Sequence, residues 1–256
     1  MLSLITINFN NDSGLKKTIE SVIEQNINYH FEHIIIDGAS TDKSNSFIEE
    51  YKRGARNVIS KSEQDDGIYD AMNKGLHMAS GSHVAFLNSG DVLVHNMVLD
   101  RISRSIIHEN TVDFLYGDIC IVDGLGKVIR EWRSGAYMQY KLFFGWMPPH
   151  PMTTIRKSIL DDCGNFDETL CIAADYDLML KVLLRRQTKV RYLSGILVHM
   201  EAGGVSNGSL RGIISSNLEV LRSWYKNKGI IFPFWIIFPF WIIFTKPLSK
   251  ILQLKR

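Results

Sequence analysis

Residues 3–9 read SLITINF and residues 33–37 read HIIID, and these two runs decide the fold. Both are short, apolar and rich in β-branched residues, which is the pattern of a buried strand. The segment between them repeats its apolar residues at the spacing of one helix face (Leu15, Ile19, Val22 and Ile23). A strand, a helix and a strand in this order predict a βαβ unit, which requires a parallel sheet.

The same alternation continues along the first 91 residues. It predicts a strand near 57–60, a helix near 69–78 and a strand at 83–87. In such sheets the functional groups lie on the loops that follow the strand ends. We therefore expect residues 1–91 to form a nucleotide-binding half.

The pattern changes after residue 112. The runs 113–122 and 127–132 are strand-like and are joined by DGLG, which predicts a hairpin. The remaining predicted elements are two helices and two strands (174–186, 209–227, 189–193 and 196–199). No linker separates the halves, so we predict one α/β domain over residues 1–227, with an acceptor half at 92–227. Its central sheet is expected to be mixed, Rossmann-like and flanked by helices.

Composition and charge narrow the function. The 256 residues are 45% hydrophobic and 22% charged, which are ordinary values for a globular chain. The first 219 residues carry a net charge of −5, because seven of the 29 basic residues follow Glu219 and none of the 27 acidic ones does. A body without a broad basic face argues against nucleic acid as a partner. Three cysteines without metal-type spacing, and a start without a basic leader, favour the cytoplasm.

Residues 230–244 read IIFPFWIIFPFWIIF, a tandem repeat of FPFWII between two lysines. The run is shorter than the ~20 residues that span a bilayer as a helix, and Pro233 and Pro239 interrupt it. Aromatic residues with basic flanks favour the bilayer interface. We therefore predict a membrane-associating tail at 228–256 that meets the membrane surface through residues 229–256. A core hairpin or a dimer contact is the alternative.

Two loops after predicted strands carry acidic residues. Asp37 stands at a strand end, where a carboxylate can accept hydrogen bonds from a nucleotide, although an Asx turn would explain it equally well. Asn88 and Asp91 follow the strand at 83–87, and their oxygens suit Mg²⁺ or Mn²⁺. A departing nucleotide diphosphate needs such a charge beside it. The alternative is a turn acid that only solvates its loop.

The helix expected in the acceptor half begins with two aspartates. Its period puts Asp175 on the apolar stripe of Leu178, while Asp177 can pair with Lys181 four residues on. We therefore expect Asp175 to point inward and Asp177 outward. An inward carboxylate at a cavity edge can act as a general base. The alternative is that each acid simply favours the helix N-terminus.

Two histidines have suggestive surroundings, although lone histidines are usually structural. His150 follows Met147-Pro148-Pro149 and is a candidate contact to the acceptor substrate. His199 precedes Met200-Glu201 and is a second candidate for contact with a metal or a phosphate.

Together these motifs resemble the inverting family 2 glycosyltransferases, which have the GT-A fold, over about residues 2–206. The stretches that carry the resemblance are 3–10, 34–42, 62–75, 86–91, 164–168 and 174–177. Among them, GIYDAMNKG at 67–75 is similar to the branch that includes the colanic acid and amylovoran exopolysaccharide transferases.

The resemblance implies a function and a site. It implies a metal-dependent enzyme of the hexosyltransferase type that moves a sugar from a nucleotide-diphosphate donor to a saccharide, with Mg²⁺ or Mn²⁺ as cofactor. A UDP-sugar is the first expectation, and a GDP-sugar or dTDP-sugar is the alternative. The implied roles are donor binding by Ile7, Phe9, Asp37, Asp66, Asn73 and Asn88, metal binding by Asp91, and proton abstraction by Asp175.

Two departures from the family pattern bear on the donor and the metal. Gly38 stands where many relatives carry a second aspartate that binds uracil, and NSGD at 88–91 replaces a more acidic metal motif. Because a single carboxylate holds a cation weakly, we expect metal binding that depends on the donor.

The predicted tail suggests where the enzyme works and on what. We expect it on the inner face of a bacterial plasma membrane, acting on a polyprenyl-diphosphate-linked saccharide in exopolysaccharide, capsule or O-antigen synthesis. A Rossmann dehydrogenase is disfavoured, because FNNDSG at 9–14 lacks the Gly-x-Gly-x-x-Gly pattern. The remaining alternative is a catalytically degenerate nucleotide-sugar-binding or assembly subunit at the membrane.

Overall fold

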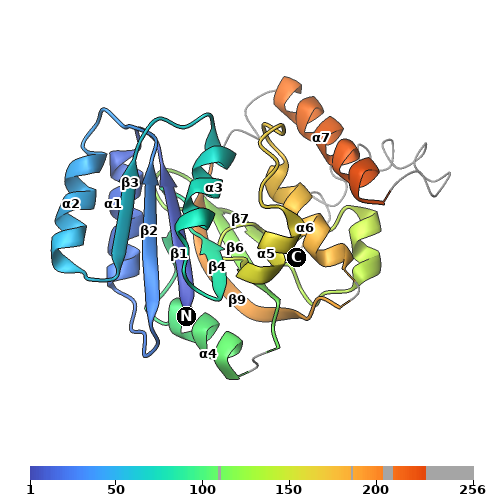
Figure 1. Cartoon of the computed structure of the whole chain (residues 1–256), viewed down its shortest axis with the longest axis horizontal. Coiled ribbons are helices and arrows are strands. Elements are labelled where there is room, and N and C mark those ends of the chain that lie inside the picture. Colours follow the sequence, from blue (N-terminus) through green and yellow to red (C-terminus); the bar gives the residue numbers. More distant parts are fainter. Residues whose placement is uncertain (109–110, 186, 204–209, 229–256) are drawn as a thin grey trace.

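The protein's computed structural model describes residues 1–108, 111–185, 187–203 and 210–228 (Figure 1). In these residues nine strands form one sheet in the order β3-β2-β1-β4-β8-β6-β9-β5, and β7 pairs with β6. The strands are β1 (Leu2–Asn8), β2 (Phe31–Asp37), β3 (Val58–Ser62), β4 (His83–Phe86), β5 (Val92–Leu93), β6 (Phe114–Val122), β7 (Val128–Trp132), β8 (Thr154–Arg156) and β9 (Val190–Glu201). The helices are α1 (Asp12–Ile23), α2 (Ser44–Gly54), α3 (Ile68–Met78), α4 (Val98–His108), the 3-10 helix η1 (Gln139–Phe144), α5 (Lys157–Cys163), α6 (Ala174–Leu184) and α7 (Leu210–Lys228).

The first half of the chain forms the parallel part of the sheet. β1 pairs in parallel with β2 on one side and with β4 on the other, and β2 pairs in parallel with β3. The predicted βαβ unit is therefore confirmed. All seven residues of β1 are buried, as expected for a central strand that is covered on both faces.

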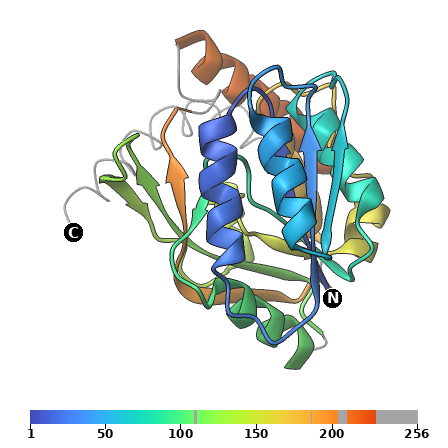
Figure 2. The ribbon, with the colours of Figure 1, turned by 90° about the vertical axis from the view of Figure 1, so that its left-hand side faces the viewer.

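Alternate side chains of β2 build cores on opposite faces of the sheet. Ile34 and Ile36 pack in one core with side chains of α3 and α6, whereas Ile35 packs in another with side chains of α1 and α2. Figure 2 shows α1 and α2 side by side in front of the sheet. The face that carries α3 is thus the one that the second half of the chain packs against.

The second half makes the sheet mixed, as predicted. β8 pairs antiparallel with β4 and with β6, and β6 and β7 form the predicted hairpin. One strand, β9, replaces the two that were expected, because residues 193–195 bulge opposite the single residue Gly117 and pairing then resumes. The bulge interrupts the apolar pattern without ending the strand. Sequence analysis did not predict α2, α4, α5, η1, β5 or β8.

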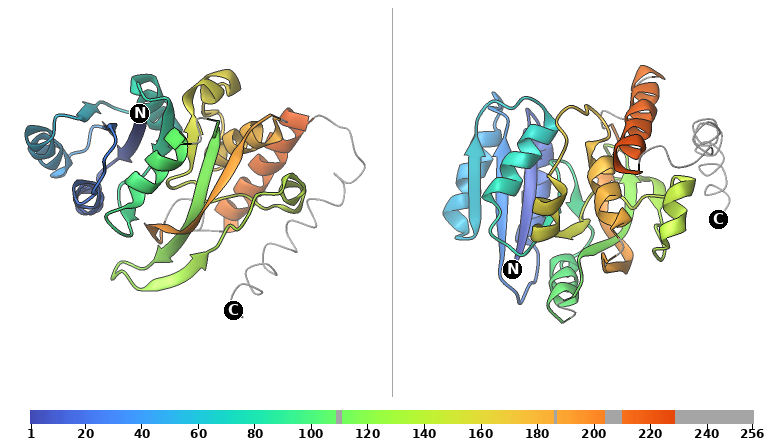
Figure 3. Two further views of the ribbon diagram at one scale, coloured as in Figure 1. Left: turned by 90° about the horizontal axis from the view of Figure 1, so that it is seen from below. Right: turned by 45° about the vertical axis from the view of Figure 1, so that its right-hand side comes forward.

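The last described helix, α7, packs against α6, and Figure 3 shows the two helices next to each other. No helix in the described part of the chain is both long enough and apolar enough to cross a bilayer. The predicted membrane-associating tail lies outside the described residues.

Gly75 allows α3 to lie close to the sheet. A Cβ at this position would come 2.5 Å from Cγ2 of Ile5 and 3.5 Å from Cγ1 of Ile36, and both isoleucines are fully buried. Because these atoms are packed in a core, they cannot swing away from an added methyl group.

We predict that Gly75→Ala lowers the free energy of unfolding by about 1–3 kcal/mol, because the core must shift to admit the methyl group. Gly54→Ala is the matched control: Gly54 ends α2, and an added Cβ would meet no atom within 4 Å. Its stability should stay unchanged or rise slightly, since alanine restricts the unfolded chain. Urea unfolding measures both variants, and equal stabilities would contradict the close packing of α3 on β1.

Candidate active site

Asp37 ends β2 at the carboxyl edge of the parallel strands, the edge opposite to the N-terminus marked in Figure 1. Its carboxylate is fully buried. Oδ1 accepts hydrogen bonds from Asn8 Nδ2 (2.8 Å) and Ser40 Oγ (2.6 Å), and Oδ2 accepts from the Ser40 N–H (2.9 Å) and Ser62 Oγ (2.8 Å). Asp37 therefore ties the ends of β1, β2 and β3 together. The Ser40 N–H makes the Asx turn that was the alternative, and contact with a nucleotide stays a prediction.

Phe9 follows β1 and has 68% of its surface exposed, whereas Ile7 is buried. A Cβ at Gly38 would lie 3.1 Å from Cδ2 of Phe9 and 2.9 Å from Oδ2 of Asp65. An exposed ring and a carboxylate thus both lie within contact of the same glycine. Such a pair can stack on a nucleotide base and accept a hydrogen bond from it.

Asp65, rather than Asp66, is the acid next to this ring. Lys74 Nζ donates to Oδ1 of Asp65 (2.6 Å) and pairs with Oδ2 of Asp70 (2.9 Å), which fixes the loop between β3 and α3. Asp66 is exposed, and its N–H donates to Oδ2 of Asp70. Sequence analysis missed Asp65, although it stands in the run 62–75 that carried the resemblance. The role of Asp66 beside a nucleotide stays a prediction.

Asn88 and Asp91 follow β4 at the same edge of the sheet. Burial raises the pKa of Asp91 to about 7; the Asn88 N–H works against this shift and the charge of Glu201 adds to it. Oδ1 of Asn88 is buried and has no hydrogen-bond partner among the residues that the structure describes. A carboxylate that is costly to ionise and an amide oxygen without a donor are groups that a cation would satisfy. These two oxygen ligands therefore fit Mg²⁺ or Mn²⁺.

The loop after β4 is fastened to the loop after β1. Asn11 Nδ2 donates to the carbonyl oxygen of Ser89 (3.3 Å), and Ser89 Oγ donates to the carbonyl oxygen of Asn11 (3.2 Å). Thr18 Oγ1 donates to the carbonyl oxygen of Asp91 (2.8 Å). The exposed ring of Phe9 and the side chains of Asn88 and Asp91 therefore stand on neighbouring loops that are bonded to each other.

His199 lies on β9, opposite Val92 of β5, which places it one strand away from Asp91. Glu201, which sequence analysis missed, ends the same strand. Its Oε2 lies 3.6 Å from where a Cβ of Gly90 would stand. In the described part of the chain no group of three or more His, Cys, Asp or Glu side chains is arranged to hold a metal. Metal binding by His199 stays a prediction.

Asp175 lies in the first turn of α6 and is partly exposed. Its Oδ1 accepts hydrogen bonds from the Tyr176 N–H (2.8 Å) and from the hydroxyl of Tyr69 (3.5 Å). Tyr69 belongs to α3, so this contact crosses from the first half of the chain to the second. Burial and the negative charge of Asp175 raise the pKa of Tyr69, which keeps its proton available for the carboxylate.

The prediction that Asp177 points outward is wrong. Asp177 is fully buried, pairs with Lys181 Nζ (2.7 Å) as predicted, and accepts a hydrogen bond from Asn227 Nδ2 (2.9 Å). The physical reason is α7, which covers the side of α6 that the sequence pattern assigned to solvent. A helix that is covered on two sides has no single apolar stripe, so its period does not separate the two acids.

Four rings form a cluster that includes Tyr69, the tyrosine in contact with Asp175. Tyr69 stacks on Phe166 with ring centroids 5.7 Å apart, and Phe86 packs against Phe166 (5.3 Å) and His150 (5.2 Å). Phe86 is the last residue of β4, the strand that leads to the two oxygen ligands. The ring cluster therefore connects the carboxylate of α6 with the carboxyl edge of the sheet.

His150 is half-buried in this cluster. Burial lowers its pKa, and the charge of Asp175 opposes the shift. The imidazole is therefore neutral at pH 7 and can both donate and accept a hydrogen bond. Its predicted contact with the acceptor stays a prediction, but the histidine does lie among the rings that adjoin Asp175.

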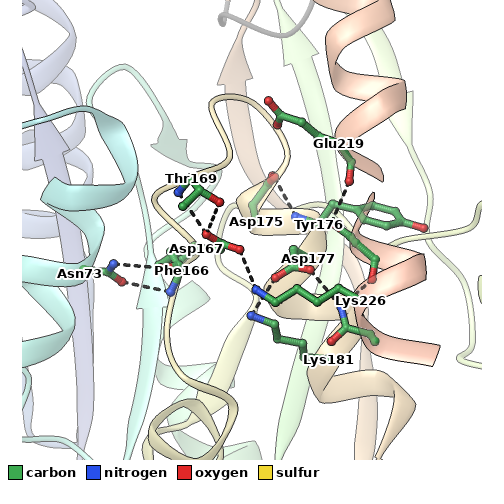
Figure 4. A network of polar contacts seen from close by, with 12 residues as sticks. Asn73, Phe166, Asp167, Thr169, Asp175, Tyr176, Asp177, Lys181, Glu219 and Lys226 are labelled. Carbon is green, nitrogen blue, oxygen red and sulfur yellow. Dashed lines mark hydrogen bonds and ion pairs between the residues drawn. The ribbon is translucent and has the colours of Figure 1, made fainter. Parts of the chain in front are cut away.

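Asn73 joins α3 to the loop that carries Phe166 (Figure 4). Nδ2 donates to the carbonyl oxygen of Phe166 (3.1 Å) and to Oε1 of Glu168 (2.6 Å), and Oδ1 accepts from the Phe166 N–H (3.0 Å). These bonds fasten the two halves, and contact with a nucleotide stays a prediction.

Sequence analysis missed Tyr69 as a site residue. Its signal was the four-residue spacing from Asn73, which puts both on one helix face.

Comparison with known proteins identifies the family. Residues 3–164 match the model of glycosyl transferase family 2. An uncharacterised glycosyltransferase of Mycobacterium tuberculosis is 30% identical over 191 residues, which are 72% of this chain and 69% of that one. A PGL/p-HBAD biosynthesis glycosyltransferase of Mycobacterium bovis is 27% identical over 210 residues, which are 81% and 79% of the two chains.

Solved structures share the fold at low identity. Staphylococcus aureus TarS 1–349 in complex with UDP has a TM-score of 0.63 at 18% identity, over 89% of this chain and 72% of that one. The mannosyltransferase PcManGT from Pyrobaculum calidifontis, in complex with GDP-Man and Mn²⁺, has a TM-score of 0.64 at 14% identity, over 93% and 67%. This chain spans 43% of a longer TarS structure. The fold is therefore a GT-A-like mixed α/β fold.

The family match covers more than half of the chain and includes the loops after β1, β2, β3 and β4. The M. tuberculosis relative extends the similarity over most of the chain's length. The chain therefore belongs to glycosyl transferase family 2 and is a glycosyltransferase.

Proposed function

We propose that this glycosyltransferase moves a sugar from a nucleotide-diphosphate donor to an acceptor hydroxyl, with inversion at the anomeric carbon and Asp175 as the general base. The contact between Asp175 and Tyr69 carries the proposal. It joins a partly exposed carboxylate of the acceptor half to α3, the helix that follows the donor-side loop with Asp65.

The donor is proposed from the donor-side loops and from the structural relatives. The ring of Phe9 and the carboxylate of Asp65 both lie next to Gly38. A ring can stack on a base, and a carboxylate can accept a hydrogen bond from the same base. The TarS structures in complex with UDP and with UDP-GlcNAc, and PcManGT in complex with GDP-Man, support a nucleotide-sugar donor. We propose a UDP-sugar first, with a GDP-sugar or dTDP-sugar as the alternative.

In the proposed reaction, Asp175 takes the proton of the acceptor hydroxyl while the hydroxyl oxygen forms a bond to the anomeric carbon. The bond from that carbon to the diphosphate breaks on the opposite face, and its electron pair leaves with the diphosphate. A single displacement inverts the configuration and needs no covalent enzyme intermediate. His150 lies in the ring cluster next to Asp175 and is the proposed contact to the acceptor.

A divalent cation, when bound, supplies positive charge beside the departing diphosphate. Asp91 and Asn88 would hold it, and His199 is a second candidate ligand. With a pKa of about 7, Asp91 keeps its proton in a large share of molecules at neutral pH, and it must lose that proton to bind a cation. Oxygens of the donor would complete the ligand set. The structure of PcManGT in complex with both GDP-Man and Mn²⁺ supports the use of a divalent cation.

We also propose that the protein attaches peripherally to the inner face of the plasma membrane through residues 229–256, which lie outside the described residues. The exposed side of α7 supports this proposal, because it leads to that tail. Ile214, Leu218 and Tyr225 are between 59% and 62% exposed and recur on one helix stripe. An apolar stripe that precedes an aromatic and basic segment suits the bilayer interface.

Membrane attachment suggests a lipid-linked acceptor. We propose a saccharide on polyprenyl diphosphate, used in the synthesis of an exopolysaccharide, a capsule or an O-antigen. Membership of the colanic acid and amylovoran branch rests on GIYDAMNKG at 67–75 and remains a prediction.

We predict that Asp175→Asn lowers kcat by about 10²–10⁴-fold, because the amide cannot take the acceptor's proton. The affinity for the donor should stay within about twofold. Turnover of a panel of nucleotide sugars and calorimetry of donor binding measure the two effects.

Asp161→Asn is the control, because Asp161 is an acid of α5 whose side chain is 57% exposed. It should keep wild-type kcat. An Asp175→Asn variant with kcat within about tenfold of wild type would show that another group is the base. A wild-type protein that binds a donor but turns over with no acceptor would favour the binding subunit.

We predict that the affinity for Mn²⁺, measured with a nucleoside diphosphate present, falls about tenfold per pH unit below pH 7 and levels off above it. The reason is that proton and cation compete for Asp91, whose pKa is about 7. Asp91→Asn should weaken binding at high pH and remove the pH dependence. Calorimetry from about pH 6 to pH 8.5 measures this; tight binding to the donor-free protein, or an affinity independent of pH, would contradict it.

We predict that deleting residues 229–256 moves the protein from the membrane fraction to the soluble fraction, because the deletion removes the aromatic repeat and its basic flanks. The deletion leaves α7 and its contacts with α6 in place. Fractionation and immunoblotting measure the distribution, and thermal unfolding checks that the domain is intact. Unchanged abundance of the truncated protein in the membrane fraction would contradict the proposed attachment.

A further inference from the structure

The backbone N–H groups of the loop before α6 have their hydrogen-bond acceptor on another helix. Ala173 is the residue at the N-cap of α6, and its methyl group accepts no hydrogen bond. Backbone N–H groups at a helix start need acceptors, and a Ser, Thr, Asp or Asn at this position usually supplies one. The residues that lead into the helix, Cys171 to Ala173, also carry backbone N–H groups that need acceptors.

Glu219 of α7 accepts hydrogen bonds from all three of these loop N–H groups. Its Oε1 accepts a hydrogen bond from the Cys171 N–H (3.0 Å), and its Oε2 accepts from the N–H groups of Ile172 (2.9 Å) and Ala173 (2.8 Å). Both carboxylate oxygens thus bind three consecutive backbone groups, with a full negative charge at the positive end of α6. Bonds of this kind, with a charged acceptor, are stronger than those between neutral groups.

The position of the proposed base depends on this loop. Asp175 stands two residues after Ala173, in the first turn of α6, and its Oδ1 accepts the N–H of the next residue, Tyr176. The direction of the carboxylate is therefore set by the backbone at 174–176, which continues the three residues that Glu219 holds. The pKa of Tyr69, the other donor to Asp175, is raised by the charge of Glu219 as well, which shows that Glu219 lies near the same group.

Other side chains of α7 bind residues that stand before and after the loop 171–173 (Figure 4). Trp224 Nε1 donates to the hydroxyl of Tyr176 (2.8 Å), and Lys226 Nζ binds Oδ2 of Asp167 (2.8 Å), which lowers the pKa of that acid. These bonds reach side chains. Glu219 differs from them because it binds the backbone that leads directly into the base.

We propose that Glu219 is a positioning residue for the general base: it acts through the backbone at 171–173 and fixes the direction of the Asp175 carboxylate. The proposal rests on the proposed role of Asp175. Small displacements of a reacting group are enough to matter, because a shift of about 1 Å can cost about 10²-fold in rate. Glu219 touches no substrate in this role, so its effect should fall on turnover and not on the donor.

The test compares Glu219→Gln, Glu219→Ala and the exposed α7 control Ser215→Ala in the full-length protein. Glutamine keeps the size and one acceptor oxygen but loses the charge and the second acceptor, whereas alanine loses both. We expect kcat to fall about 10-fold to 100-fold in Glu219→Gln and further in Glu219→Ala. KM for the donor, and donor affinity by calorimetry, should stay within about twofold of wild type, and Ser215→Ala should behave as wild type.

The outcomes separate a positioning role from a merely structural one. A kcat within about twofold of wild type in Glu219→Gln would overturn the proposal. So would a loss that appears equally in donor affinity, because that pattern indicates a damaged domain. If Glu219→Ala does not fold, Glu219→Gln still decides the question. Failure of the proposed function has a different signature, namely a wild-type protein without turnover or an active Asp175→Asn variant.

Discussion

The amide of Asn73 fixes α3 against the loop of Phe166, beside the pairing of β4 with β8 that joins the two halves in one sheet. Its Nδ2 and Oδ1 bind the carbonyl oxygen and the N–H of the same residue, Phe166, which holds that residue as a neighbouring strand would. The ring of Phe166 is thereby kept against Tyr69 and Phe86. The contact of Asp175 with Tyr69 adjoins this ring cluster. The first half of the chain supplies the parallel part of the sheet and the second half supplies Asp175, and the Asn73 amide holds α3 and the loop of Phe166 together between them.

Two aspartates at the same sheet edge show how burial can serve different ends. Asp37 is fully buried, and four hydrogen bonds satisfy its carboxylate, so these bonds hold the strand ends together. Asp91 is also buried, but its pKa rises to about 7 because the surroundings do not compensate its charge. The two acids differ in the groups around them: hydroxyl, amide and N–H donors surround Asp37, whereas Asp91 lies near another acid, Glu201. An acid in the second situation is the one that a cationic ligand would stabilise most.

Sequence patterns predicted the parts of this structure whose cause is local. The runs at 3–9 and 33–37 are apolar because β1 and β2 are buried, and their lengths and order were enough to predict the parallel sheet. The two residues of β5 and the three of β8 are too short to show a period, and their pairing depends on strands far along the chain. The bulge in β9 broke the alternation that would have shown one strand. Tertiary contacts, and not local pattern, decide these elements.

The same limit explains the candidate site. Asp175 could be chosen from its position in a helix, but the orientation of Asp177 could not, because α7 covers it and begins 33 residues later. Glu219 gave no local signal at all: its partners are backbone groups more than 40 residues away, and backbone groups are the same in every sequence. Tyr69 did have a signal in the sequence, since its spacing puts it on the same helix face as Asn73.

The order of the elements along the chain has a consequence for biosynthesis. Domains emerge from the ribosome with their N-terminal parts first, and the donor-side strands are complete within the first 91 residues. The carboxylate that holds the loop before α6 belongs to α7, so α6 is made well before that carboxylate exists. A nascent chain can thus fold its first strands while the loop that leads to Asp175 still lacks its partner. Under the proposed function, the base would reach its final position only after α7 has been made.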